Sequence, residues 1–144
     1  MNPLDFFPAV PDSLLRSVLL GLFAAGLAWQ LNKFLGRLPG TAPVYLAPLV
    51  EEAAKTGPAA LFAADIFFTH FVFGLAEGAW ELVSGRRNGF YAGLGAVLTH
   101  SVFGSITVFV LQTCGSLLPA LAAACLGHAL WNHVVLVVVS RLRK

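Results

Sequence analysis

The sequence predicts an all-α fold, a polytopic membrane bundle of about five transmembrane helices. Of its 144 residues, 58% are hydrophobic and only 11% are charged, whereas ordinary soluble domains carry about 25% charged residues. Apolar segments of roughly 20 residues, the length that crosses a bilayer, follow one another with short polar breaks between them. Because backbone groups inside lipid must bond to one another, these segments are expected to be helices.

The breaks divide the chain into five predicted spans within one membrane domain, residues 1–144. Pro39-Gly40 follows the first span, a polar turn at residues 85–89 ends the third, and Gly115-Ser116 follows the fourth. The link between the second and third spans is much shorter, essentially Ala64-Asp65. The predicted spans cover residues 13–35, 43–64, 66–84, 89–112 and 117–139.

The first span is expected to stay in the protein as a helix. Asp5 and Asp12 stand where a signal peptide carries basic residues, and the apolar run from Ser13 is long enough to cross the membrane. Cleavage near Ala28 is the alternative.

The second span is the least typical of the five. Glu51, Glu52 and Lys55 interrupt its apolar run, and Pro48 and Pro58 flank them. A charged residue at the middle of a membrane helix costs roughly 2.5–3.5 kcal/mol. The segment could therefore lie on the membrane surface, which would leave four spans.

The distribution of basic residues favours five spans over four. With five, seven basic residues lie on one side, and only Arg16 lies on the other, together with Asp5 and Asp12; with four, they split six to two. The positive-inside rule prefers the first division, so the N-terminus is expected outside and the C-terminus in the cytoplasm. The seven residues are Lys33, Arg37, Arg86, Arg87, Arg141, Arg143 and Lys144.

Five spans also place the strongly polar side chains in one layer. At a rise of 1.5 Å per residue, Glu52 lies about 14 Å below the cytoplasmic face and Glu77 about 10 Å below it. His100 and His128 lie about 16–18 Å deep, and Asn132 about 12 Å. With four spans, Glu52 and Glu77 would lie toward opposite ends of the bundle. Ionisable residues inside a membrane are rare and are candidates for function.

The charged triplet of the second span supplies the first candidates. Lys55 follows Glu51 by four residues and Glu52 by three, so its ammonium can pair with one glutamate while the other faces a cavity. The hypothesis is that Glu52, assisted by Glu51, acts as a general base on water. The alternative is an ion-paired helix at the surface.

The later spans supply the partners. His100 lies at mid-span among small residues, where packing does not explain an imidazole. His128 and Asn132 share one face of the last helix, and an asparagine there can stabilise an oxyanion. Glu77 shares a face with His70, which is expected to be structural. Each of these side chains could instead form a hydrogen bond between helices.

The same residues are suited to a metal ion. Two histidines and a carboxylate can bind a catalytic zinc and leave one position for water. His100, His128 and Glu77 are the predicted ligands if zinc is the cofactor; otherwise the histidines position the water. Cys114 and Cys125 match no metal or redox spacing and are expected to pack as thiols. No run of Lys and Arg is dense enough to indicate nucleic acid binding.

In their order, these motifs resemble the PrsW family of intramembrane proteases, which is grouped with the CAAX-prenyl endopeptidases (Rce1-like) and with APH-1. The resemblance covers roughly residues 43 to 140, and the chain is shorter than is typical of the family, with fewer helices. It implies cleavage of a peptide bond within or beside the bilayer by glutamate- and histidine-activated water, with or without a metal. The matching residues are Glu51, Glu52 and Lys55; Phe73, Gly74 and Glu77; His100; and His128 with Asn132.

The sequence therefore predicts an intramembrane endopeptidase of a prokaryotic cell membrane that acts on a membrane protein substrate, alone or with an oligomeric or other partner subunit. Two alternatives stay open. One is a non-catalytic scaffold in the manner of APH-1, in which the polar layer holds helices together. The other is a small transporter or proton relay, since chains of Glu and His also mark ion paths.

Overall fold

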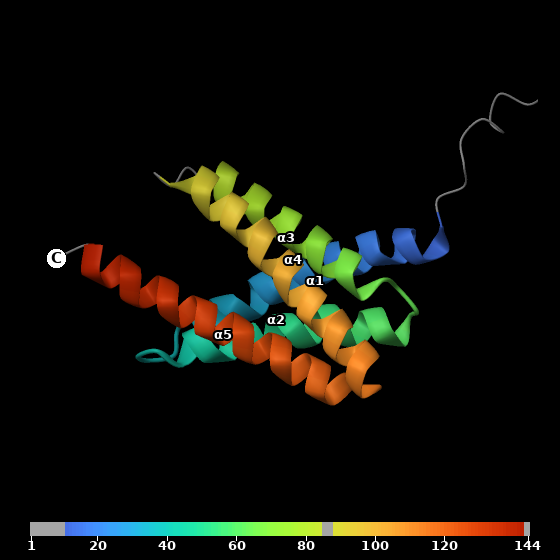
Figure 1. Ribbon diagram of the computed structural model, residues 1–144. Coiled ribbons are helices and arrows are strands. Elements are labelled where there is room, and N and C mark those ends of the chain that lie inside the picture. Colours follow the sequence, from blue (N-terminus) through green and yellow to red (C-terminus); the bar gives the residue numbers. More distant parts are fainter. Residues whose placement is uncertain (1–10, 85–87, 143–144) are drawn as a thin grey trace, which may run out of the picture.

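The computed structural model describes residues 11–84 and 88–142 of the chain (Figure 1). Within these ranges the chain forms five α-helices and no strand, so the predicted all-α fold is confirmed. The helices are α1 (Asp12–Leu35), α2 (Ala42–Leu61), α3 (Ile66–Val83), α4 (Gly89–Cys114) and α5 (Leu117–Leu142).

Four of these helices are long and apolar enough to cross a membrane, namely α1, α3, α4 and α5. The chain is therefore an integral membrane protein built as a helical bundle. Helix α2 differs because its 20 residues include Glu51, Glu52 and Lys55. That α2 also crosses the bilayer stays a prediction.

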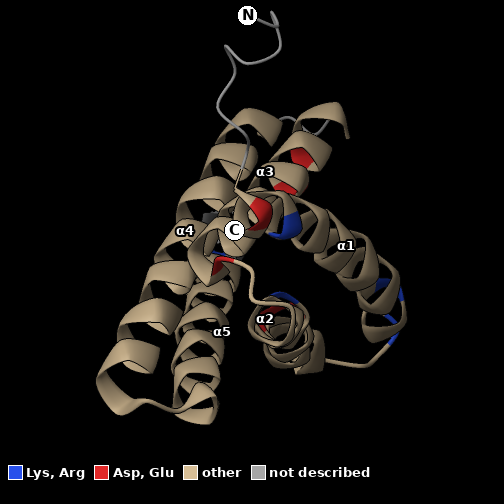
Figure 2. Cartoon of the chain, turned by 90° about the vertical axis from the view of Figure 1, so that its right-hand side faces the viewer, with Lys and Arg blue, Asp and Glu red and all other residues tan. Residues whose placement is uncertain are grey.

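Helix α2 runs through the bundle and does not lie across one of its ends. It contacts α1, α3 and α5. Figure 2, which looks nearly along α2, shows α1 on one side of it and α5 on the other. Consecutive helices run in opposite directions, so the connections between them alternate between the two ends of the bundle (Figure 1).

The C-terminal ends of α1 and α5 lie at the same end of the bundle (Figure 1), with Lys33 and Arg141 in their last turns. These two basic residues thus lie at the same end of the bundle, while the orientation of the chain in the membrane stays a prediction. Other charged residues used in that prediction lie outside the described residues, namely Asp5, Arg86, Arg87, Arg143 and Lys144.

The opposite end of the bundle is held together around the short link between α2 and α3. The Asp65 side chain caps α3 by accepting a hydrogen bond from the backbone N–H of Phe68 at 2.7 Å. Ser17 Oγ of α1 accepts from the backbone N–H of Asp65 at 2.9 Å. Arg16 donates to the carbonyl of Phe62 at 3.0 Å. These bonds anchor the start of α1 to the start of α3.

Glycine allows α3 and α4 to approach closely. A Cβ on Gly78 would lie 2.8 Å from the carbonyl oxygen of Gly93, and a Cβ on Gly93 would lie 2.8 Å from the carbonyl oxygen of Gly78. A Cβ on Gly74 would lie 3.1 Å from the Cβ of His100. This close packing, of the kind that small residues permit in membranes, brings Glu77 of α3 within reach of His100 of α4.

Gly93→Ala is expected to destabilise the bundle by about 1–3 kcal/mol, because the added methyl meets backbone that cannot move aside. Gly95→Ala is the matched control, since it adds the same methyl to the same helix where nothing lies within 4 Å. Thermal unfolding of the two purified variants in detergent should give a lower midpoint for Gly93→Ala only. Equal midpoints would contradict the close α3–α4 contact.

Candidate functional site

Helix α2 carries its charged side chains into the middle of the bundle. Glu52 and Lys55 are fully buried, and Glu51 is 6% exposed. Because α2 is covered by α1, α3 and α5, these side chains meet polar groups of neighbouring helices and not lipid. This is the arrangement that ionisable groups inside membrane proteins require.

Glu52 is the centre of a hydrogen-bonded cluster. Its Oε1 accepts from Lys55 Nζ at 2.6 Å and from His128 Nδ1 at 2.9 Å. Its Oε2 lies 3.6 Å from Nδ1 of the buried His70. Because a carboxylate only accepts, the His128 proton lies on Nδ1, and the lone pair of Nε2 is left available.

The Lys55 ammonium extends the cluster to α4 and α3. Its Nζ lies 2.9 Å from His100 Nδ1 and 4.3 Å from the centroid of the Phe73 ring. Because an ammonium only donates, His100 accepts at Nδ1 and carries its proton on Nε2. That nitrogen donates to Glu77 Oε2 at 2.6 Å. The hydrogen-bonded chain thus runs from Glu52 to Glu77.

Aromatic rings hold both imidazoles in place. His128 stacks on Phe103, with ring centroids 4.7 Å apart and planes 20° apart. His100 meets the Phe73 ring edge-on at 4.7 Å, and the two imidazoles meet edge-on at 5.1 Å. Each ring is therefore fixed by packing as well as by hydrogen bonds, which is how functional side chains are pre-organised.

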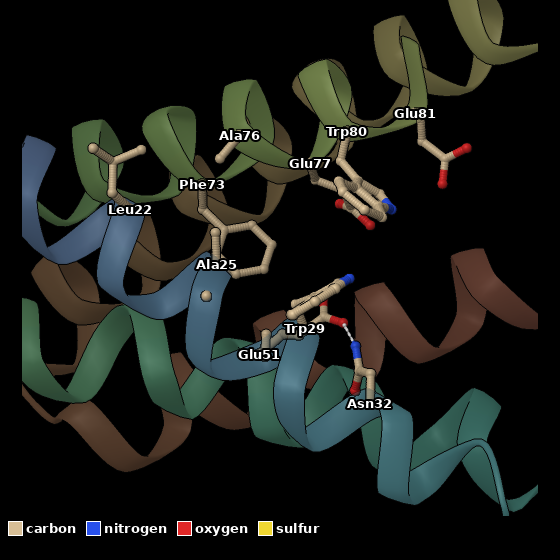
Figure 3. A pocket seen from close by; sticks show the side chains of 12 residues that line it. Leu22, Ala25, Trp29, Asn32, Glu51, Phe73, Ala76, Glu77, Trp80 and Glu81 are labelled. Atoms are coloured by element: carbon tan, nitrogen blue, oxygen red, sulfur yellow. Dashed lines mark hydrogen bonds between the residues drawn. The ribbon is translucent and has the colours of Figure 1, made fainter. Parts of the chain in front are cut away.

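Glu51 faces a cavity of about 610 Å³ between α1 and α3 (Figure 3). Asn32 Nδ2 donates to Glu51 Oε1 at 2.7 Å, the bond drawn as a dashed line in Figure 3. The other oxygen, Oε2, lies 3.8 Å from His128 Nε2, the nitrogen with the available lone pair. Two acceptors at this separation can share one water molecule.

The predicted site residues meet in this cluster, with two differences from the sequence-based hypothesis. Glu52, the expected general base, is enclosed by Lys55 and His128, whereas Glu51 lines the cavity. Asn132 is half-buried, and its side chain forms no hydrogen bond with the part of the chain that the structure describes, so its role as an oxyanion donor stays a prediction. The residues that do meet are Glu51, Glu52, Lys55, Glu77, His100 and His128.

The structure adds two polar partners that sequence reasoning missed. Asn32 holds Glu51, and Thr56 Oγ1 lies 3.1 Å from His70 Nε2. The only sequence signal for Asn32 is an amide near the end of an apolar span. Thr56 follows Lys55 directly and gave no separate signal, because a threonine hydroxyl in a helix often hydrogen-bonds a backbone carbonyl of the preceding turn.

A zinc ion fits these residues by type but not by arrangement. Glu51, His100 and His128 each offer a ligand atom within 4.8 Å of the others, so Glu51 stands where Glu77 was predicted. His128 Nε2 is available, but both nitrogens of His100 are engaged, one by Lys55 and one by Glu77. A dication would have to displace one of these bonds and lie beside an ammonium, which repels it.

Comparisons with protein-family models, with curated proteins and with solved structures found no match for this chain.

Lys55→Met is expected to lower the free energy of unfolding by about 3–5 kcal/mol, because it leaves the Glu52 carboxylate buried without its charge partner. The double variant Glu52→Gln/Lys55→Met should recover part of this loss, since no unpaired charge remains. Unfolding of the purified protein in detergent measures both.

The matched control for Lys55→Met is Asp12→Asn, which removes an exposed pair with Arg16 at 3.9 Å. An exposed pair contributes about 1 kcal/mol or less. If Lys55→Met were as stable as Asp12→Asn, the buried pair would not hold the cluster together.

Proposed function

We propose that this protein is an intramembrane endopeptidase that hydrolyses a peptide bond of a membrane protein substrate. The proposal rests on Glu51 and His128: a carboxylate that lines a cavity lies 3.8 Å from an imidazole nitrogen whose lone pair is available. The order of the motifs, which resembles that of the PrsW intramembrane proteases, supports the same activity.

In the proposed mechanism, Glu51 and His128 hold the attacking water between them. The water donates one hydrogen to Glu51 Oε2 and the other to His128 Nε2, so that an oxygen lone pair is free to attack. Asn32 fixes the Glu51 carboxylate and Glu52 fixes the His128 imidazole. Neither acceptor therefore has to reorganise during the reaction.

Hydrolysis then requires two proton transfers. As the water oxygen bonds to the carbonyl carbon of the peptide, its proton passes to Glu51, and the carbonyl oxygen becomes an oxyanion. The C–N bond breaks while the leaving nitrogen takes that proton from Glu51. The products are a carboxyl terminus and an amine terminus, and Glu51 returns to its carboxylate form.

Lys55 supplies the fixed positive charge of the site. It balances the charge of Glu52, which a buried carboxylate needs if it is to remain an acceptor for His128. Glu77 holds His100 and thereby keeps the His100 lone pair directed at Lys55. The buried cluster thus positions the pair of residues that holds the water.

We further propose that α2 crosses the bilayer of a prokaryotic cell membrane, with the N-terminus outside and the C-terminus in the cytoplasm. The alternating directions of the helices support this topology. So does the location of Lys33 and Arg141 at one end of the bundle, because basic residues gather on the cytoplasmic side.

A non-catalytic scaffold is the second candidate function. Its support is that the cluster joins α2 to α3, α4 and α5 through buried hydrogen bonds, as polar residues between membrane helices do. A proton relay has less support, because the hydrogen-bonded chain found among the described residues runs from Glu52 to Glu77, and Glu77 lines the same cavity as Glu51.

Glu51→Gln and His128→Gln are each expected to slow cleavage of a single-span peptide in proteoliposomes by about 10²–10⁴-fold. Glu51→Gln removes the carboxylate that takes up the proton of the water, and His128→Gln removes the imidazole nitrogen that orients it. The matched control is His133→Gln on the same helix, since His133 is exposed and bonds Tyr45 at 3.0 Å outside the cluster. It should cleave at the wild-type rate.

Full cleavage by both Glu51→Gln and His128→Gln would show that water is activated elsewhere. If the wild-type protein cleaved nothing and the two variants failed to fold, the scaffold would be favoured.

A further inference from the structure

The cavity in front of Glu51 is a groove that is closed at one end and open at the other. At the closed end α1 and α3 touch, and a Cβ on Gly21 would lie 2.8 Å from both the Thr69 carbonyl oxygen and Val72. From there the two helices diverge (Figure 1). Side chains of both helices line the space between them (Figure 3).

The groove has the length of a short extended peptide. Along α3 its lining runs from Phe73 to Glu81, a separation of eight residues, or about 12 Å at the rise of a helix. An extended chain rises about 3.3 Å per residue, so roughly four residues fit. Glu51 lies on the far side of the groove (Figure 3), where it would reach the backbone of such a segment.

The groove is acidic. Its described lining residues include three carboxylates, Glu51, Glu77 and Glu81, and neither lysine nor arginine. The Glu77 side chain is 42% exposed even though it accepts a hydrogen bond from His100. Carboxylates gathered in a cleft with apolar walls focus a negative potential and attract cations.

At the open part of the groove, Trp29 of α1 and Trp80 of α3 project toward each other from opposite walls. The rings of Trp29 and Trp80 meet edge-on with centroids 5.6 Å apart (Figure 3). Lys33 Nζ lies 3.3 Å from the centroid of the Trp29 ring. Tryptophan is the aromatic residue that attracts cations most strongly. Trp29 therefore already binds an ammonium, supplied by the next turn of its own helix.

We infer that this groove binds an extended peptide segment carrying a lysine or arginine, which replaces Lys33 on Trp29 and places a neighbouring peptide bond at Glu51. The inference rests on the proposed function. Segments of this kind flank membrane helices on the cytoplasmic side, where basic residues gather. The open end of the groove lies toward Lys33, which the proposed topology places on that side.

Binding is measured separately from cleavage. The probe is a fluorescent synthetic peptide with one apolar span followed by Lys-Lys-Ala-Leu, and the matched peptide has glutamine in place of both lysines. Both are titrated against the full-length chain in phosphatidylcholine nanodiscs, with His128→Gln present to prevent turnover. The lysine peptide is expected to bind about fivefold more tightly or better.

Lys33→Gln tests the competition for Trp29. It frees the Trp29 ring and is expected to raise the affinity for the lysine peptide by roughly two- to fivefold. Arg37→Gln is the matched control, because it removes the same charge one turn further along, where the guanidinium lies 5.3 Å from the Phe34 ring centroid. It should leave the affinity nearly unchanged. Trp29→Leu should reduce the preference for lysine over glutamine to the part that the groove carboxylates provide.

The inference is overturned if the lysine and glutamine peptides bind with equal affinity. It is also overturned if Lys33→Gln and Arg37→Gln raise the affinity for the lysine peptide equally. Both results count whether or not the wild-type protein cleaves the peptide. If the wild-type protein binds the lysine peptide selectively but does not cleave it, the groove is a site for basic peptide segments and the proposed hydrolysis is overturned. The phosphatidylcholine headgroup already offers a quaternary ammonium to Trp29. In nanodiscs of phosphatidylethanolamine, whose headgroup offers a primary ammonium like that of lysine, the preference for the lysine peptide should persist. Its loss there would assign the groove to lipid and overturn the inference.

Discussion

The rest of the structure depends on the buried ion pair between Glu52 and Lys55. Removing an ion from water costs several kcal/mol, so two charges without exposed surface persist only where each has further partners at hydrogen-bond distance. Glu52 has His128 of α5, and Lys55 has His100 of α4. The pair therefore links α2 to α5 and to α4 through side-chain hydrogen bonds, which helps to explain how α2 lies in the middle of a membrane bundle.

The same pair gives two adjacent glutamates different roles. Successive residues on a helix point about 100° apart. With Glu52 turned toward Lys55, Glu51 faces α1 and the groove, where Asn32 holds it. One carboxylate thus orients an imidazole, while the other faces the groove. The Lys55 ammonium occupies the lone pair of His100 Nδ1, which a metal ion would need as a ligand. The ammonium itself therefore provides the positive charge at this place.

The five helices could be predicted from the sequence, because backbone groups inside lipid must hydrogen-bond to one another and each long apolar segment therefore forms a helix. Depth along each helix also predicted that Glu77, His100 and His128 would meet near α2. It could not predict which glutamate faces the groove, since spacing allows Lys55 to pair with either. Nor could the sequence predict that Asn32 would bind Glu51 or that an acidic groove would form. Both depend on the angle at which α1 and α3 diverge.

The most direct test is cleavage of a single-span peptide by the purified protein, reconstituted in lipid, before and after treatment with a strong zinc chelator. If Lys55 supplies the positive charge and Glu51 with His128 activates the water, the rate is unchanged by the chelator. Loss of cleavage after chelation, with recovery on adding one equivalent of zinc, would contradict this mechanism and make Glu51, His100 and His128 metal ligands.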